Sequence, residues 1–143
     1  MTVHRVLLID DEEEFTAALA ERLEMRGMAV DTASDGETAL EKIAARDYDA
    51  VLLDLAMPGW DGIETLKRIK KERADLQVVL LTGHATVGKG IEAMKLGAMD
   101  LVEKPVAFRD LLQKIEEASA KKALLVEARL EHELDEILRK KGW

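Results

Sequence analysis

The chain has 143 residues, no cysteine and a formal net charge of −8. Its length and its 48% share of hydrophobic residues suit one domain with a core of its own, and the lack of cysteine excludes disulfides and thiolate metal sites. Residues 107–143 carry eight basic and eight acidic side chains, so the whole negative excess lies in residues 1–106. This charge argues against direct nucleic-acid binding. No apolar run approaches membrane-spanning length, so a cytoplasmic protein without membrane insertion is expected.

Short apolar runs alternate with stretches of helical periodicity along the chain. The expected strands are residues 5–9, 28–33, 51–54, 77–82 and 100–103. The expected helices carry apolar residues within 15–23, 39–44, 63–69 and 91–96, and a last helix begins near Phe108. This alternation predicts an α/β fold: a doubly wound, five-stranded parallel sheet of the flavodoxin-like order 2-1-3-4-5, with helices on both faces.

The most informative position is Asp54, at the end of a strand that reads as buried on both faces. Turn signals follow it at Pro58-Gly59 and Asp61-Gly62. In a parallel α/β sheet, ligands bind at the edge formed by the carboxyl ends of the strands. Polar residues close the other strands on that edge as well, namely Asp10 and Asp11 after the first, Thr82 at the fourth and Lys104 after the fifth.

These side chains suit one kind of chemistry. Three neighbouring carboxylates repel one another, and a cation would neutralise them. Oxygen ligands without His or Cys favour Mg²⁺. Lys104 adds a point charge and Thr82 a hydroxyl donor, so the set as a whole suits a phosphoryl group attached to Asp54 or held beside it.

Each residue taken alone also has a structural interpretation. Asp11 with Glu14 three residues later is a helix-capping pattern, Asp54 can cap a turn, and Lys104 can be a solvated surface charge. The conjunction at four strand ends of one sheet edge favours the functional interpretation.

The motifs at these strand ends resemble those of the receiver domain of two-component response regulators. The resemblance covers residues 4 to about 120 and rests on Asp10-Asp11, Leu53-Asp54-Leu55, Met57-Pro58, Asp61-Gly62, Leu81-Thr82-Gly83, Gly97-Ala98 and Glu103-Lys104-Pro105. It implies that Asp54 accepts a phosphoryl group from a sensor histidine kinase, a phosphotransfer protein or a small acyl phosphate.

The resemblance also assigns roles to the surrounding residues. Asp11, Asp54 and the main-chain carbonyl of Ala56 would bind Mg²⁺, with Asp10 acting mostly through a metal-bound water. Thr82 and Lys104 would hold the phosphoryl oxygens. The Lys104-Pro105 peptide bond would be cis, and the chain would not be a turnover enzyme.

Two features modify the family pattern. Many receivers carry Tyr or Phe three residues before the strand-five lysine, where this chain has Leu101, and the aromatic form of the activation switch is therefore not expected. The positions of Ala56 and His84 influence the hydrolysis of the acyl phosphate in the family, so Ala56→Asn should change the lifetime of the phosphorylated form.

Residues 121–143 are predicted to continue the last helix beyond a domain of residues 1–120. Leu130, Leu134, Ile137 and Leu138 form an apolar stripe among charges of both signs. The stripe is compatible with a helix that folds back on its domain and with a helix that binds a second copy or another partner. A homodimer through helix four, strand five and helix five is the family alternative.

No helix-turn-helix, basic recognition helix or Walker motif follows the receiver-like segment. The expectation is thus a stand-alone receiver that acts on an unidentified downstream protein. Two other functions stay open: a Mg²⁺-dependent phosphatase of the haloacid dehalogenase kind, with an aspartyl nucleophile, and a pseudo-receiver that binds partners without phosphorylation.

Overall fold

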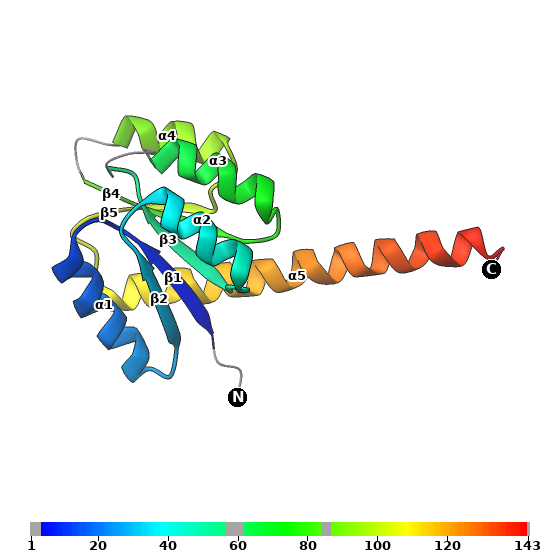
Figure 1. Cartoon of the computed structure of the whole chain (residues 1–143), viewed down its shortest axis with the longest axis horizontal. Coiled ribbons are helices and arrows are strands. Elements are labelled where there is room, and N and C mark those ends of the chain that lie inside the picture. Colours follow the sequence, from blue (N-terminus) through cyan, green and yellow to red (C-terminus); the bar gives the residue numbers. More distant parts are fainter. Residues whose placement is uncertain (1–3, 57–61, 84–86, 143) are drawn as a thin grey trace.

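The computed structural model describes residues 4–56, 62–83 and 87–142 as five strands and five helices in strict alternation (Figure 1). The elements are β1 (Arg5–Ile9), α1 (Glu13–Met25), β2 (Ala29–Ala33), α2 (Gly36–Ala45), β3 (Ala50–Asp54), α3 (Gly62–Glu72), β4 (Val78–Thr82), α4 (Val87–Lys95), β5 (Asp100–Glu103) and α5 (Phe108–Lys140). All strand pairs are parallel, and the order is β2-β1-β3-β4-β5. The predicted fold is confirmed.

The sheet is buried on both faces, which explains the nearly continuous apolar strands. Every residue of β3 and β4 is buried. Alternate strand residues point to opposite sides, so Leu7 and Leu53 join α2, α3 and α4 in one core cluster, whereas Leu8 and Leu52 join α1 and α5 in the other. α1 and α4 end two residues before Gly27 and Gly97, which both adopt a positive φ.

The strand register brings the polar strand ends together. Ile9 pairs with Leu53 and Asp54 with Leu81, so the residues that follow β1 and end β3 are neighbours at the carboxyl edge. On the other side, Thr82 pairs with Glu103, and the N–H of Lys104 donates to the carbonyl of Thr82 at 2.8 Å. The Lys104-Pro105 peptide bond is cis, as expected. The turn residues Pro58, Gly59 and Asp61, and His84, lie outside the described residues.

The last helix, α5, is longer than the domain it packs on. It runs for 33 residues without interruption, and its C-terminal half projects away from the sheet (Figure 1). The boundary predicted at residue 120 stays a prediction, because the helix is continuous there. Within the described ranges, no helix combines the length and the apolar character needed to cross a bilayer.

Candidate functional site

Asp54 is a buried carboxylate at the end of β3, and only 6% of its side chain is exposed. Burial raises its pKa to about 6, an effect that the N–H of Ala56 opposes and the neighbouring Asp10 reinforces. The Ala56 N–H donates to Asp54 Oδ1 at 3.2 Å. The other carboxylate oxygen, Oδ2, lies 3.9 Å from Lys104 Nζ. Asp54 therefore has one oxygen held by the backbone and one facing a cation.

Lys104 extends from the end of β5 across the sheet edge to the carboxylates of β1 and β3. Its Nζ donates to Asp10 Oδ2 at 2.9 Å and lies 3.6 Å from Glu12 Oε1. Burial by itself would lower the pKa of Lys104, but the hydrogen bond and the charge of Asp10, with Asp54 and Glu12, raise it overall. The ammonium group is thus held in its charged form at the centre of the acidic site.

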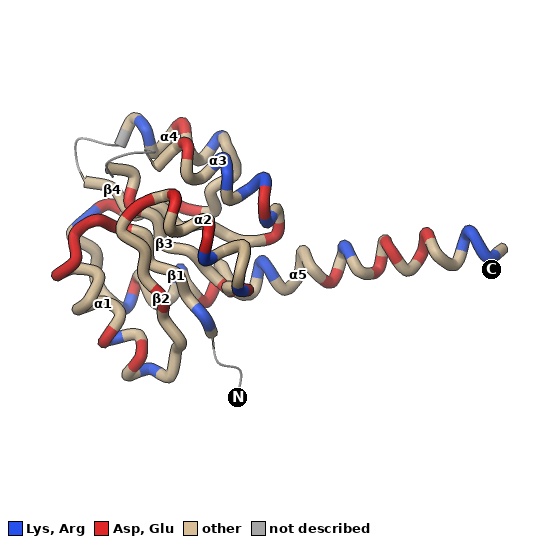
Figure 2. Tube along the Cα trace, in the orientation of Figure 1, with Lys and Arg blue, Asp and Glu red and all other residues tan. Residues whose placement is uncertain are grey.

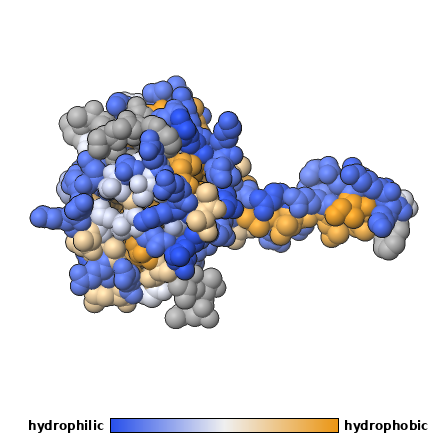
Figure 3. Space-filling view, viewed as in Figure 1, coloured by the Kyte–Doolittle hydropathy of each residue, from blue (hydrophilic) through white to orange (hydrophobic). Residues whose placement is uncertain are grey.

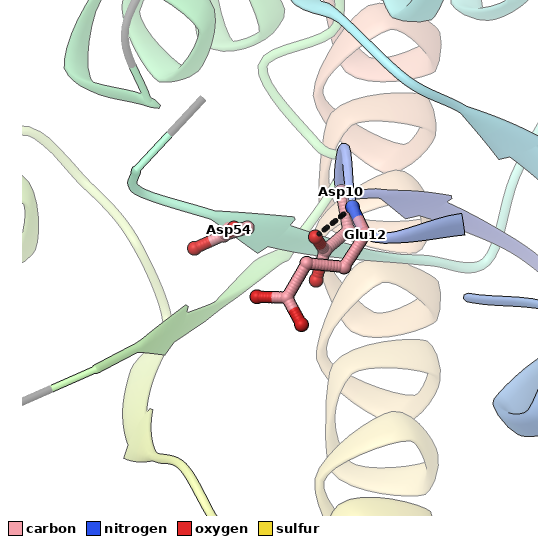
Figure 4. Close-up of side chains that lie close together, drawn as sticks. All are labelled: Asp10, Glu12 and Asp54. Carbon is pink, nitrogen blue, oxygen red and sulfur yellow. Dashed lines mark hydrogen bonds between the residues drawn. The ribbon is translucent and has the colours of Figure 1, made fainter. Parts of the chain in front are cut away.

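An acidic cluster forms around this ammonium group from Asp10, Glu12 and Asp54 (Figure 4). One carboxylate oxygen from each lies within 4.8 Å of the others. Asp10 is buried, and its Oδ1 accepts a hydrogen bond from the N–H of Glu12 at 2.9 Å, which fixes the turn between β1 and α1. Asp11, expected as a ligand, is exposed and is not a member of this cluster.

The other two expected residues flank Asp54. Thr82 is fully buried at the end of β4, and its hydroxyl donates to the carbonyl of Gly83 at 2.6 Å. Ala56 is exposed two residues after Asp54. Thr82 thus joins Asp10, Asp54 and Lys104, so four of the predicted strand-end residues occupy one edge of the sheet, as the predicted strand order requires.

The donor set fits a hard divalent cation. Its oxygens belong to carboxylates, and no His or Cys is among the clustered residues. A single ammonium group compensates three carboxylates, so a net negative charge remains in a partly buried place. Binding of a cation at such a site is therefore favourable, because it neutralises the excess negative charge.

Sequence reasoning missed two residues of this site. Glu12 belongs to an acidic run, but the pattern could not show which acid of the turn reaches the carboxylates of Asp10 and Asp54. Phe15 appeared only as an apolar helix position, yet Lys104 Nζ lies 4.5 Å from the centroid of its ring. The contact between α1 and β5 depends on the chain path, and no local sequence signal encodes it.

Leu101, which replaces the usual aromatic residue, packs from β5 against α4. It is partly buried and contacts the core cluster below α2, α3 and α4. A Cβ atom added at Gly90 of α4 would lie 2.7 Å from Leu101 Cδ2, so the helix approaches this side chain closely. Leu101 therefore occupies the space between β5 and α4, where a bulkier ring would need another arrangement.

Comparisons with known proteins agree with this geometry. Residues 6–116 match the family described as "Response regulator receiver domain". The C4-dicarboxylate transport transcriptional regulatory protein DctD of Pseudomonas aeruginosa is 37% identical over 126 residues, which are 87% of this chain and 27% of that protein. The transcriptional regulatory protein FixJ of Bradyrhizobium diazoefficiens is 36% identical over 82% of this chain and 57% of its own length. The chain thus spans between about a quarter and somewhat over half of these relatives.

A solved structure extends the likeness to the whole fold. The receiver domain protein of Clostridium thermocellum superposes with a TM-score of 0.82 at 35% identity, covering 86% of this chain and 99% of its own. The family match lies over the same segment that carries Asp10, Asp54, Thr82 and Lys104. The chain therefore belongs to the receiver domains of two-component response regulators.

Proposed function

We propose that this chain is a phosphoaccepting signalling switch in which Asp54 takes a phosphoryl group from a histidine kinase or a phosphotransfer protein, with Mg²⁺ as cofactor. The observation that carries the proposal is the position of Asp54: a buried carboxylate at the carboxyl edge, with Lys104 Nζ 3.9 Å from one oxygen. We expect the chain to act in the cytoplasm, where ATP sustains the phosphohistidine of a kinase. It would not turn over a separate substrate.

The proposed transfer is an in-line displacement at phosphorus. An Asp54 oxygen attacks the phosphorus atom while the bond from phosphorus to the imidazole nitrogen of the donor breaks, and the electron pair of that bond stays on the nitrogen. The product is an aspartyl phosphate. Water later attacks the phosphorus, which releases inorganic phosphate and regenerates the Asp54 carboxylate.

The side chains around Asp54 suit this transfer by position and charge. The Ala56 N–H holds one carboxylate oxygen and leaves the other directed toward Lys104. The ammonium group of Lys104 would pair with a phosphoryl oxygen, and the hydroxyl of Thr82, after leaving the Gly83 carbonyl, would donate to another.

We assign the cation to the β1 and β3 ends of the acidic cluster. A bound Mg²⁺ would neutralise the carboxylates and the charge on the transferred phosphoryl oxygens. Asp10, Asp11, Asp54 and the carbonyl of Ala56 are the proposed ligands, directly or through water. Glu12 is a further candidate, because its carboxylate already lies with those of Asp10 and Asp54.

The proposal is tested by intact mass after incubation with a small acyl phosphate and Mg²⁺. We expect one phosphoryl group on the wild-type chain and none on Asp54→Ala. Asp135→Ala, which removes an exposed carboxylate from α5, is the matched control and should be labelled like the wild type. Chelation of Mg²⁺ should abolish labelling.

Three outcomes would contradict the proposal. Labelling that persists in Asp54→Ala would place the acceptor elsewhere. No labelling by acyl phosphate or by any phosphohistidine donor, with Mg²⁺ still bound, would favour a binding module that works without phosphate. Sustained turnover of a phosphate monoester, lost in Asp10→Asn, would favour a phosphatase.

A further inference from the structure

The projecting half of α5 carries an apolar stripe that no other described residue of the chain covers. Leu130, Leu134 and Ile137 are 53%, 55% and 54% exposed. With Val126 they recur at spacings of four, four and three residues, which keeps them on one side of a helix. Figure 3 shows this apolar side along the length of the projection. A short helix without tertiary packing is only marginally stable in water. A partner that covers the stripe would therefore stabilise this part of α5.

The direction of the projection is fixed by contacts at the base of the domain. Lys122 Nζ donates to Asp47 Oδ1 at 2.7 Å and also to the carbonyl of Tyr48. About two helical turns later, Arg129 forms an ion pair with Asp75. In the described parts of the chain, this is the last ion pair between α5 and the domain. The remaining turns of α5 therefore leave the domain in a defined direction.

A groove of about 560 Å³ lies in the angle between the domain and the projecting helix. Val126, Leu130 and Leu134 line it, so the groove and the stripe form one surface. The charged side chains in its wall are the acidic Asp49, Glu127 and Glu131 and the basic Lys122. Because Lys122 already pairs with Asp47, the wall keeps an acidic excess. The occupant of this groove should thus be apolar along one side and basic near its end.

The end of α5 itself has this character. Ile137 and Leu138 are followed by the basic residues Arg139, Lys140 and Lys141. Figure 2 shows how charge is distributed along the projection: most charged residues in its middle are acidic, and those at its end are basic. A parallel, in-register pair would set the basic ends against each other, whereas an antiparallel pair sets each basic end against an acidic groove.

We infer that two copies of this chain associate through an antiparallel pair of α5 helices, in which each C-terminal turn occupies the groove of the other copy. With Leu134 facing the partner's Leu134, Leu130 meets the partner's Leu138 and Glu127 meets the partner's Lys141. The two domains stand at opposite ends of the helix pair. The carboxyl edges with Asp54 stay outside the contact, so this inference is independent of the proposed function.

The inference is tested by sedimentation of the full chain over a range of concentrations. We expect the wild type to reach twice the chain mass of 15.9 kDa. Leu134→Glu, which puts a charge at the centre of the stripe, should weaken association by about tenfold or more. Leu124→Glu is the matched control, because Leu124 is 67% exposed and lies about 120° around the helix from Leu130.

A wild-type chain that stays monomeric would overturn the inference, and so would a dimer that survives Leu134→Glu. The second result would indicate association through another surface, such as the exposed Ile91 and Met94 of α4. Circular dichroism of each variant checks that the domain is folded, so loss of association cannot be confused with loss of structure.

Orientation is tested with single cysteines, since the chain has none of its own. Glu127→Cys and Lys141→Cys chains, when mixed and oxidised, should form a disulfide between the two variants. Each variant alone should crosslink poorly. A parallel pair would give the reverse result, with Glu127→Cys linking to itself, and would overturn the antiparallel arrangement.

Discussion

At the scale of single residues, the site is a compromise between burial and charge. Asp54, the proposed phosphoryl acceptor, is shielded from bulk water, and that burial raises its pKa to about 6. Lys104 offsets part of the cost at a distance of 3.9 Å, but its shortest contact is with Asp10. The ionised site therefore carries a free-energy cost in the metal-free protein.

Asp54→Asn should stabilise the metal-free protein in a pH-dependent way. The raised pKa means that folded Asp54 holds a proton which the unfolded chain has already released, so its contribution to stability falls as pH rises from about 4 to about 6. At about pH 7 the Asn variant should be more stable by about 1 to 3 kcal/mol, and near pH 4 the two proteins should converge. Urea unfolding in metal-free buffer measures both values.

Asp135→Asn, on the exposed part of α5, controls for the loss of one negative charge. An equal gap between the Asp54→Asn variant and the wild type at both pH values would show that proton linkage at Asp54 is not its source.

At the scale of secondary-structure elements, close approaches between helices and strands hold the site in place. α3 begins at the buried Gly62, whose N–H donates to the carbonyl of Leu55, just after Asp54. A Cβ atom at Gly62 would lie 2.5 Å from Leu55 Cα. Because the nearest atom belongs to the backbone, a change of side-chain rotamer cannot relieve this clash.

Gly62→Ala should lower the free energy of unfolding by about 1 to 3 kcal/mol, because the clash outweighs the gain in helix propensity. Gly88→Ala in α4 is the matched control: a Cβ there meets nothing within 4 Å, so the same change should stabilise by about 0.5 to 1 kcal/mol. Denaturant titration of both variants measures the difference, and the expectation fails if the two changes have the same sign.

At the scale of the whole molecule, charge is distributed unevenly. The full excess of −8 lies in residues 1–106, and the acidic cluster concentrates part of it at one edge of the sheet. The fold is thus stabilised by packing on both faces of the sheet and opposed by electrostatic repulsion at the edge where the site lies.

Millimolar Mg²⁺ should raise the melting temperature, because a ligand that binds only the folded chain stabilises it. At a concentration about a hundred times the dissociation constant, the gain would be about 2.7 kcal/mol, or several degrees for a chain of this size. Calorimetry at matched ionic strength measures the shift. Asp54→Asn should show a smaller one, and equal shifts in both proteins would indicate general screening instead of a site.

The fold of this chain could be predicted from its sequence alone, and the residue types at the strand ends indicated which chemistry to test. Apolar runs of strand length, alternating with helical periodicity, predicted the strands and helices because these patterns report burial directly. The alternation of strands and helices then predicted a parallel sheet of order 2-1-3-4-5. The same topology brought Asp10, Asp54, Thr82 and Lys104 to one edge, since parallel strands end together. The roles of these residues stay predictions until phosphorylation is measured.

Which side chains contact one another could not be predicted from the sequence and became clear from the three-dimensional structure. Among the acids of residues 10–14, the structure brings the carboxylate of Glu12 close to those of Asp10 and Asp54 and leaves Asp11 outside this cluster. It sets Phe15 beneath Lys104, and it directs α5 away from the domain through Lys122 and Arg129. Sequence periodicity fixes the face on which a residue lies, but turn geometry and contacts between distant segments fix where its side chain ends.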